Sequence, residues 1–396
     1  MSALSGLHRF GRLLLPQKLR WFAFSALLRC RTIRPEGAPN QPGQGVYLVG
    51  FFSRISGTAS VARAFQRHFT AAGRPVTAID LGTSLAHGLP LPESGPFATP
   101  LEVRRNAAAR SPGIVLVVMD AAYSPLPLLL LGRHFRRSKR LVALWFWELP
   151  EVPRSWRWSA RCFDEIWTFS RFNYAAVCAV SDNVKLVELP MDAAAPRSRR
   201  FAADKLRVLL IFNMSANFAR KNPLAAVEAF RLAFGDTERA ELLIKVTEGE
   251  RFADGMARLR SACDRSRNIL LHENPLTDAA VGRLFEEADI YLSLHRSEGL
   301  GQPLLEAIRH GLYVVATGWS GNVEFMQGRE RCILVPYELV PVVDPQGTYP
   351  RTAQWADPDV GAAARALRRI ARAELGAAAS ALFPAGSADG SDGPAA

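Results

Sequence analysis

The sequence predicts an α/β protein made of two doubly wound domains, and three observations lead to this prediction. Its 396 residues exceed the roughly 250 to 300 at which a single hydrophobic core stops growing, so two domains are expected. Short apolar runs without alternation recur along the chain, as the buried strands of parallel sheets require. Helical patterns separate most of these runs, and strands that alternate with helices build layered α/β domains.

The first domain is expected to cover residues 41–190. Its first strand is the apolar run GVYLVGFF, which begins at Gly45 and is followed by the polar turn SRISGTAS. A helical pattern, VARAFQRHFTAAG, then ends at Gly73. Three further runs have the composition of buried strands, namely RPVTAID, GIVLVVMD and LVALWFWELP. Strands and helices should therefore alternate through this domain.

The second domain is expected to cover residues 191–375. The polar, proline-bearing residues 189–204 are typical of a linker between domains. Helical stretches such as NPLAAVEAFRLAF and TDAAVGRLFEEA alternate with further apolar runs. Residues 376–396 consist mainly of Ala, Gly, Ser, Asp and Pro, which cannot bury enough apolar surface to become ordered, so we expect a disordered tail. The runs expected to form buried strands are LRVLLIF, AELLIKV, NILLHE, DIYLSLH and LYVVAT.

The charge of the chain indicates an anionic partner. The formal net charge is +12 at pH 7 and the sequence pI is near 10.0. Residues 1–40 form a separate segment in which basic residues alternate with Trp, Phe and Leu, without an acidic residue before Arg34. This pattern is typical of a helix that lies on an anionic membrane, and it equally fits a helix packed on the first domain. The basic run 132–140 either extends the same face or is an ordinary solvated helix.

Several classes of protein are excluded by what the sequence lacks. Patterns of a zinc finger, an RNA-recognition motif or a helix-turn-helix are missing, so no nucleic acid is expected as a partner. No apolar run reaches the roughly 18 residues of a membrane-spanning helix, and no signal-peptide cleavage pattern follows the N-terminus. Five scattered cysteines without a C-x-x-C pair argue against a disulfide framework and a zinc site. We expect a cytoplasmic protein, attached peripherally, if at all, to the inner face of the plasma membrane.

The stretch HRSEGLGQPLLEAIRHGLYVVATGWSGNVEF, residues 295–325, places Glu298 and Glu306 eight positions apart around a glycine-rich turn. A buried strand precedes this turn, and Pro303 suits the start of the helix that follows. Backbone N–H groups at such a helix start can bind a phosphate. We expect Glu306 in the first helical turn, where its carboxylate can accept hydrogen bonds from the vicinal hydroxyls of a ribose. Glu298 then lies nearer whatever the phosphate carries, so the spacing favours a nucleotide sugar.

This stretch resembles glycosyltransferase family 4, whose members are retaining enzymes with an E-x7-E motif. The segments LHRSEGLG, VVATG and SGNVEFM carry the resemblance more specifically than two glutamates alone. Further similarity lies in residues 146–172, in residues 219–234, and in LVPYELVPV and YPRTAQWADPDV, so that it spans about residues 45–371. The resemblance implies the GT-B fold, in which two Rossmann-like domains face a central cleft. The family binds a nucleotide-sugar donor in the C-terminal domain and the acceptor mainly against the N-terminal one.

The resemblance also implies roles for the charged residues. It implies that Glu306 binds the ribose, that Glu298 contacts sugar hydroxyls and that Lys221 neutralises the donor diphosphate. A departing diphosphate needs positive charge, and Lys221 follows a buried strand whose carboxyl end opens onto the site. The alternative interpretation is that Arg220 and Lys221 are a surface pair at a helix start. Relatives often place an arginine a few residues earlier, where this chain has Ser215 to Asn217, so Arg220 is the nearest cation.

Further donor contacts are implied on two loops. After Glu298, the residues Gly299, Leu300 and Gly301 are expected to lie against the donor, and Asn322 is expected to contact it from the following loop. In the first domain, SGTASVAR keeps Gly57 but has Ala59 where relatives usually have a second glycine. We therefore expect a weaker phosphate contact there.

Glu148 is the candidate in the first domain for a role near the reacting centre. It lies at the end of a buried strand, where relatives often place a histidine or an acid, and it is expected to orient the acceptor. Alternatively, Trp145, Trp147 and Glu148 form a structural corner with Pro150, because aromatic residues beside proline commonly pack as core.

We expect no metal ion and no cofactor, since the nucleotide sugar is a co-substrate. Asp357 and Asp359 form a D-x-D pattern that resembles a metal site. Their place at the start of a helix after Trp355 favours an N-cap, in which the carboxylate accepts a backbone N–H.

The predicted function is that of a metal-independent, retaining hexosyltransferase. It would move a mannose- or glucose-type sugar, from GDP-mannose or a UDP-hexose, to a glycan or lipid-linked acceptor in surface polysaccharide biosynthesis. One alternative is a non-catalytic scaffold of the same fold that binds nucleotide sugars, which the altered phosphate loop and the unusual C-terminus favour. Against it, Glu298, Lys221 and Glu306 are all present. A phosphorylase of the same fold is a further alternative and would need a pocket for inorganic phosphate.

Overall fold

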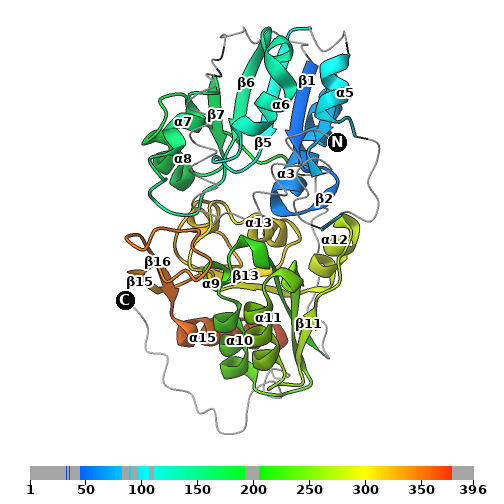
Figure 1. Ribbon diagram of the computed structural model, residues 1–396. Coiled ribbons are helices and arrows are strands. Elements are labelled where there is room, and N and C mark those ends of the chain that lie inside the picture. The colour runs from blue at the N-terminus through cyan, green and yellow to red at the C-terminus, as the bar shows by residue number, and fades with distance from the viewer. Residues whose placement is uncertain are drawn as a thin grey trace. The chain divides into compact units, whose positions relative to one another are not determined.

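The computed structural model describes residues 33, 35, 45–82, 89–90, 97–106, 111–191 and 205–376. Apart from Ile33, Pro35 and Gly376, the predicted N-terminal segment 1–40 and the predicted tail 376–396 lie outside the described residues. The chain divides into two compact units, residues 1–193 and 194–396. Figure 1 colours the first unit from blue to green and the second from green to red. Within the described part of the chain, no helix is long and apolar enough to cross a membrane.

The first unit is built on a sheet of six parallel strands, in the order β3-β1-β5-β6-β7-β8. Four of these strands correspond to the apolar runs that the sequence predicted. The other two, β7 and β8, are short and contain charged residues, so no continuous apolar run marks them. The strands are β1 (Gly45–Gly50), β3 (Val76–Asp80), β5 (Gly113–Val118), β6 (Lys139–Leu144), β7 (Glu165–Thr168) and β8 (Val184–Leu186).

Helices cover both faces of this sheet. Helix α3 (Gly57–Ala71) begins where the Ser56 hydroxyl accepts a hydrogen bond from the Ala59 N–H at 3.1 Å, a side-chain N-cap. Its Phe65 packs into the core formed by one face of β1, β5 and β6. On the opposite face, the ring of Tyr47 meets Phe135 of α6 edge-on at 5.0 Å. The remaining elements are β2 (Arg54–Ile55), β4 (Leu89–Pro90), α5 (Pro100–Arg105), α6 (Pro125–Arg136), α7 (Trp156–Ala160) and α8 (Arg171–Cys178).

The second unit also contains six parallel strands, in the order β11-β10-β9-β12-β13-β14. The chain runs outward from β9 to β11 and then returns to the other side of β9. The direction of the strand order therefore reverses between β9 and β12. The strands are β9 (Leu206–Asn213), β10 (Ala240–Thr247), β11 (Ile269–His272), β12 (Ile290–Ser293), β13 (Tyr313–Thr317) and β14 (Cys332–Val335).

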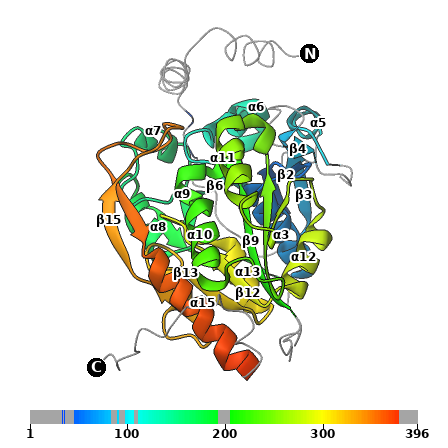
Figure 2. The ribbon, with the colours of Figure 1, turned by 90° about the horizontal axis from the view of Figure 1, so that it is seen from below.

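Two hydrophobic cores lie on the two faces of this second sheet. Val208 and Leu210 of β9 belong to the core covered by α10, α11 and α15, whereas Leu209 belongs to the core covered by α12 and α13. This alternation has the period of two that a strand imposes. Helix α15 lies beside α10 (Figure 2), and Arg368 donates a hydrogen bond from Nε to the Ala233 carbonyl at 3.2 Å. The helices are α9 (Phe218–Lys221), α10 (Pro223–Phe234), α11 (Ala253–Cys263), α12 (Asp278–Glu287), α13 (Gln302–Arg309), α14 (Val323–Met326) and α15 (Val360–Leu375).

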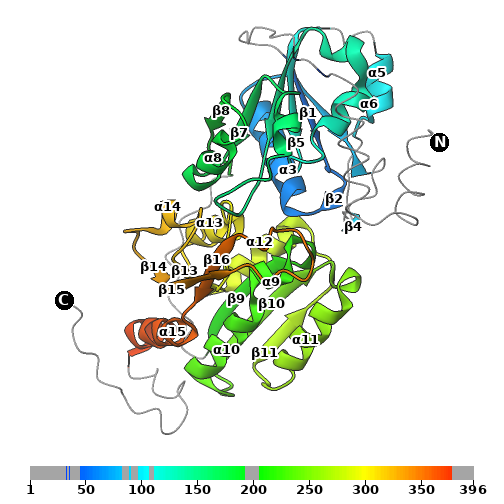
Figure 3. The ribbon, with the colours of Figure 1, turned by 60° about the vertical axis from the view of Figure 1, so that its left-hand side comes forward.

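A two-stranded antiparallel hairpin stands apart from the main sheet of the second unit. It consists of β15 (Tyr337–Pro341) and β16 (Gln354–Pro358), joined by residues 342–353. Figure 3 shows the hairpin beside α9. The segments that form it entered the sequence analysis through the family resemblance and the D-x-D pattern, and Asp357, which was expected at a helix start, lies in β16 instead. Most residues of β15 are exposed, so they do not have the apolar pattern of a buried strand.

Candidate functional site

The candidate site lies where the strand order of the second sheet reverses. Ligands of doubly wound proteins bind outside the carboxyl ends of the strands at such a switch point. Here β9 and β12 are direct neighbours. The segment after β9 contains Arg220 and Lys221, and the segment after β12 contains Glu298. The sheet therefore brings together residues that are almost 80 positions apart in sequence.

A single helical turn presents the two cations. Helix α9 is flanked by Asn217 and Asn222, which have left-handed φ angles of 75° and 48°. Asparagine adopts this conformation more readily than most residues. The Asn217 side chain accepts a hydrogen bond from the Arg220 N–H at 3.1 Å, and Asn222 donates from Nδ2 to the Leu294 carbonyl at 3.0 Å. A hydrogen bond within the turn therefore fixes its first end, and a hydrogen bond to the loop after β12 fixes its second end.

Glu298 is paired with both cations. Its carboxylate forms an ion pair with Nζ of Lys221, and its Oε2 lies 3.2 Å from Nη1 of Arg220. The guanidinium of Arg220 is buried and also donates to the carbonyls of Ser297 and Ala216, at 2.7 and 2.8 Å. Burial alone would raise the pKa of Glu298, but the charges of Lys221 and Arg220 lower it to about 2. Glu298 is therefore ionised at every pH at which the protein is handled.

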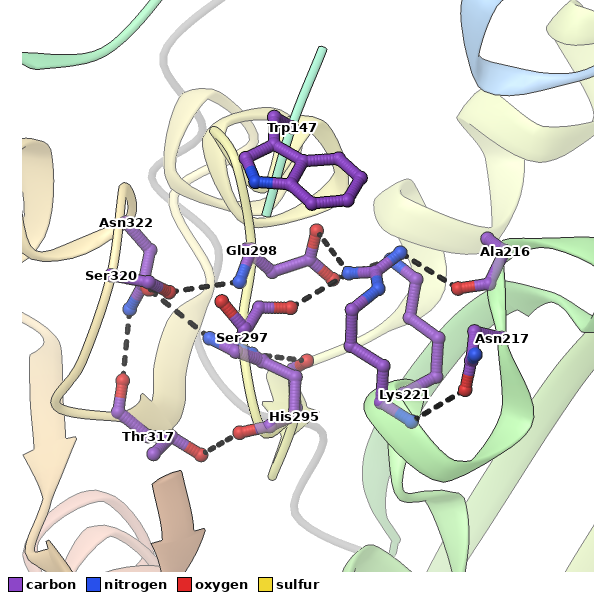
Figure 4. Close-up of polar contacts among 12 residues, drawn as sticks. Trp147, Ala216, Asn217, Lys221, His295, Ser297, Glu298, Thr317, Ser320 and Asn322 are labelled. Carbon is purple, nitrogen blue, oxygen red and sulfur yellow. Dashed lines mark hydrogen bonds and ion pairs between the residues drawn. The ribbon is translucent and has the colours of Figure 1, made fainter. Parts of the chain in front are cut away.

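The loop between β13 and α14 holds the Glu298 backbone from the opposite side. Figure 4 shows Ser320 on one side of Glu298 and Lys221 on the other. The Ser320 hydroxyl accepts the Glu298 N–H at 2.8 Å, and the Gly321 N–H donates to the Glu298 carbonyl at 2.9 Å. Ser320 has a φ of 79°, which is a strained value for a residue other than glycine. The position of this glutamate is thus determined by contacts to both its side chain and its backbone.

A fully buried histidine lies beneath the loop. Nδ1 of His295 is 3.0 Å from the Ser293 hydroxyl, and Nε2 is 3.1 Å from Oδ1 of Asn322. Because an amide oxygen only accepts, Nε2 carries the proton and Nδ1 accepts from Ser293. The Thr317 hydroxyl donates to the His295 carbonyl at 2.6 Å. Burial lowers the pKa of His295 to about 4, and the nearby positive charges of Lys221 and Arg220 contribute, so the imidazole is neutral.

The structure assigns supporting positions to two residues that the sequence placed against the donor. Asn322 is fully buried, and its amide is used by His295 and by the Thr317 carbonyl at 2.9 Å. It holds the loops together, and the donor contact expected of this residue stays a prediction. Arg220 is also buried, and its guanidinium contacts the carboxylate of Glu298 and the carbonyl of Ser297 in the same loop. The sequence motif could not distinguish these residues from those at the surface of the site, because burial depends on the loops that cover them.

The position of Glu306 differs from the expectation in one respect. Helix α13 begins at Gln302, so Glu306 is its fifth residue and lies in the second turn instead of the first. Its side chain keeps 36% of its surface exposed, and Oε1 lies 3.5 Å from Nε2 of His310. The carboxylate is thus accessible to a ligand, although it is one residue farther from the helix start than the sequence suggested.

The glycine-rich loop lies between Glu298 and α13. Gly301 has a φ of 86°, and a Cβ there would approach Cδ1 of Leu304 to 2.7 Å. The backbone conformation therefore favours glycine, while the close atom is the end of the Leu304 side chain. Lys221, Glu298 and Gly301 line one pocket together with Pro303 and residues of β9 and β12. The predicted loop residues Gly299 and Leu300 precede this glycine.

The other two predicted site residues belong to the first unit. Gly57 is the first residue of α3 and is exposed, and neither its φ nor the space around it requires glycine. Glu148 is half-buried and follows β6. The neighbouring indoles of Trp145 and Trp147 are buried against Trp156, with ring centroids 5.6 and 4.8 Å apart. The aromatic corner is thus present, and the Glu148 carboxyl lies beside it.

Asp120 is a site candidate that the sequence analysis missed. It follows β5, which is a neighbour of β1 at the point where the strand order of the first sheet reverses. Asp120 is exposed at the surface, and the protein packed near its carboxylate together with the negative charge of Glu148 raises the pKa of Asp120 to about 6. The sequence feature that could have identified Asp120 is its position immediately after the apolar run GIVLVVM.

The D-x-D pattern has other roles in the structure. Asp359 is the N-cap of α15 and accepts the Ala362 N–H at 2.8 Å, which confirms the predicted cap. Asp357 accepts from Nη2 of Arg296 at 2.9 Å. Among the residues that the structure describes, no group of three or more His, Cys, Asp or Glu side chains is arranged to hold a metal ion.

Comparison with known families gives one match. The model of the family described as "Family 4 Glycosyltransferase in conflict systems" matches residues 173–382, more than half of the chain. No curated protein matches the chain at a significant level.

Similar solved structures have the same two-unit architecture. A glycosyltransferase from Rickettsia africae is 15% identical with a TM-score of 0.53, and the match covers 86% of this chain and 94% of that one. A sucrose-phosphate synthase from Thermosynechococcus elongatus is 16% identical with a TM-score of 0.54, covering 86% and 95%. TarM of S. aureus is 14% identical with a TM-score of 0.44, and only 44% of its length is covered. The first two matches confirm the predicted GT-B fold.

Proposed function

The chain belongs to glycosyltransferase family 4, and we propose that its second unit binds a nucleotide sugar whose hexose is transferred to an acceptor hydroxyl with retained configuration. The observation that carries this proposal is the cluster of Glu298, Lys221 and Arg220 at the β9–β12 switch point. Two cations meet one carboxylate there, which leaves one positive charge for an anionic ligand. A diphosphate leaving group needs such charge as the glycosidic bond breaks.

The residues of the site divide the task between them. Lys221, which keeps some exposure beside the pocket, is proposed to bind the diphosphate. Glu298 is proposed to accept hydrogen bonds from hydroxyls of the transferred sugar, and its negative charge favours the positive charge that grows on the sugar ring. Glu306, exposed on α13, is proposed to bind the ribose. Gly301 allows the backbone to approach the ligand closely.

The proposal also names the chemical class of the donor and of the acceptor. A mannose- or glucose-type sugar on GDP or UDP is the proposed donor, and a glycan or lipid-linked acceptor of surface polysaccharide synthesis is the proposed partner. Attachment to the inner face of an anionic membrane is supported by the basic residues of the segment 1–40. It is also supported by exposed arginines on the adjacent helices α5 and α6 and at the end of α6, namely Arg104, Arg105, Arg133 and Arg137.

A panel of radiolabelled nucleotide sugars tests the enzyme and its donor together. The protein should release or transfer sugar from one of GDP-mannose, UDP-glucose, UDP-galactose or UDP-N-acetylglucosamine, and NMR of the product should show retained configuration. Activity should persist in EDTA, because Lys221 and Arg220 supply the charge that a metal ion would otherwise give. Tight binding of a nucleotide sugar without any turnover would instead favour the scaffold alternative.

Substitution of Glu306 connects the activity to the site. Glu306→Ala should weaken binding of the bare nucleoside diphosphate by roughly ten- to hundredfold, the cost of a charge-assisted hydrogen bond. His310→Ala is the matched control, since it removes the intrahelical partner and leaves the carboxylate in place. Unchanged calorimetric affinity in Glu306→Ala would remove this residue from the ribose site.

A further inference from the structure

We propose that the β15–β16 hairpin, residues 337–358 and called here the arm, is a positioning element of the donor site. Its tip holds the turn that carries Lys221, and its base holds the loop that carries Glu298. The part of this inference that concerns nucleotide binding rests on the proposed function. The part that concerns the placement of Lys221 depends only on the contacts between these segments.

The tip is organised by one carboxylate. Oδ2 of Asp344 accepts the backbone N–H groups of Thr348 and Tyr349, at 2.6 and 3.0 Å. Oδ1 accepts the Gln346 N–H at 2.8 Å and Nδ2 of Asn217 at 2.7 Å. Three of these four hydrogen bonds fold the tip onto itself. The fourth joins the folded tip to the residue that caps α9.

Gln346 makes a second connection from the tip to α9. Its Oε1 accepts the N–H of Phe218, the first residue of that helix, at 3.0 Å. The first N–H groups of any helix lack intrahelical partners and need acceptors from elsewhere. Here the N–H of Phe218 donates to Gln346 of the arm, and the N–H of Arg220 donates to Asn217, which is itself hydrogen-bonded to Asp344 of the arm. The arm therefore satisfies one of these donors directly and the other through Asn217.

The turn depends on such outside contacts because it is short. A helix nucleus is unfavourable by itself, and four residues provide almost no propagation. The two flanking asparagines also adopt left-handed conformations that most sequences avoid. The hydrogen bonds from the arm therefore stabilise the conformation that places Lys221 against Glu298.

The base of the arm fixes the other wall of the site. Asp357 of β16 accepts from Nη2 of Arg296 at 2.9 Å, and the Ala356 N–H donates to the Arg296 carbonyl at 3.0 Å. Arg296 in turn donates from Nη1 to the Ala219 carbonyl at 2.7 Å. The arm thus contacts the Lys221 turn and the Glu298 loop separately, and Arg296 links the two.

The contact of Gln346 with α9 can be changed without disturbing the packed part of the arm. Trp355 and Tyr349 are buried, with ring centroids 6.2 Å apart, and give the arm a small core. Gln346 makes its contact outside this core. Glu338 lies on β15 and is exposed, which makes it a suitable control for a general effect of changing the arm.

Chemical labelling of Lys221 tests the inference without any nucleotide. The rate of acylation of Lys221 by an amine-reactive ester, followed by mass spectrometry, should rise in Gln346→Ala and Asp344→Ala. The expected increase is roughly two- to tenfold, the range for a lost neutral hydrogen bond. Glu338→Gln should label like the unmodified protein. Unchanged labelling in both tip variants, or an equal rise in Glu338→Gln, would overturn the inference.

Nucleotide affinity gives a second readout that a merely structural role would not reproduce. Gln346→Ala should weaken the binding of UDP or GDP in the otherwise unmodified protein but have no further effect in a Lys221→Ala background, because the arm acts through this lysine. Equal losses in the two backgrounds would contradict positioning. If the unmodified protein binds neither UDP nor GDP, the proposed function fails, whereas the labelling experiment still decides the role of the arm.

Discussion

At the scale of single residues, the site contains an anion of its own, the carboxylate of Glu298. Glu298 is paired with Arg220, its buried support, and with Lys221, the cation proposed to bind the diphosphate. A nucleotide that binds there introduces a second anion beside the first. The carboxylate therefore opposes the binding of the leaving group while it favours the positive charge of the transition state.

This arrangement predicts three effects of Glu298→Gln. The variant should lose kcat, and without added nucleotide it should be less stable by about 3 kcal/mol, because the buried charge of Arg220 loses its carboxylate. UDP or GDP should then raise its melting temperature more than that of the unmodified protein, since the diphosphate replaces the missing anion. Glu338→Gln, exposed on the arm, serves as the control. Equal ligand-induced shifts with unchanged turnover would show that Glu298 is not part of the site.

The neutral His295 predicts a dependence of stability on pH. Its pKa is about 4 in the folded protein against 6.5 for an unperturbed histidine. As the pH falls from 6.5 to 4, the unfolded chain binds a proton that the folded protein does not, so stability is lost in this window. His295→Gln removes this contribution of up to about 1.4 kcal/mol per pH unit.

Urea unfolding at several pH values measures this effect. The variant should be less stable than the unmodified protein at pH 7.5, and the difference should narrow at pH 5. His134→Gln changes an exposed histidine and should leave the pH dependence as it is. A difference that stays constant from pH 7.5 to 5 would mean that His295 titrates normally.

The sequence predicted which charged residues belong to the site better than it predicted what each residue does there. The family resemblance identified Glu298, Lys221 and Arg220, the charged residues that meet at the switch point, because their residue types can be read directly from the sequence. It did not reveal that Arg220 and Asn322 are buried supports, since burial is decided by segments far away in the sequence. Asn217 and Ser320 were missed for a related reason. Their importance lies in backbone conformation and in hydrogen bonds that no local pattern encodes.

At the scale of elements, the turn 217–222 is the part of the site most sensitive to backbone conformation. Asn222 has a φ of 48° and donates a side-chain hydrogen bond to Leu294. Asn222→Gly and Asn222→Ala both remove this hydrogen bond, but only alanine adds the cost of a left-handed conformation. Asn222→Ala should therefore be less stable than Asn222→Gly by about 1 kcal/mol in urea unfolding. Equal stability of the two variants would place this residue outside the left-handed region in solution.

The elements that the sequence predicted are those with a strong local signal. Buried strands such as β5 and β9 form continuous apolar runs, and the predicted helices have clear caps or periodicity. The short strands β7 and β8 are at and near one edge of their sheet and carry charged residues, so they resemble loops in the sequence. The strands β15 and β16 pair with each other, and the loop between them is joined to the distant residue Asn217, a contact that a pattern in their own residues cannot reveal.

At the scale of the whole molecule, the excess of positive charge predicts binding to anionic membranes. The full-length protein should sediment with vesicles that contain phosphatidylserine, and salt should weaken this binding. A variant that begins near Pro35 should lose most of the binding and retain only what the arginines of α5 and α6 provide. Equal sedimentation with neutral vesicles would rule out an electrostatic attachment.

The pairing between β9 and β12 also has a consequence for the order in which the second unit is made. β9 pairs with β10 along eight residues, but its register with β12 includes only two pairs, Ile290 with Val208 and Tyr291 with Leu209. During synthesis on a ribosome, β9, β10 and β11 can associate before β12 has emerged. The β9–β12 pairing beside the site therefore forms after the β9–β10 pairing, and it involves fewer residues. Any chain that stalls or is cleaved before residue 290 has half of a sheet and no site at all.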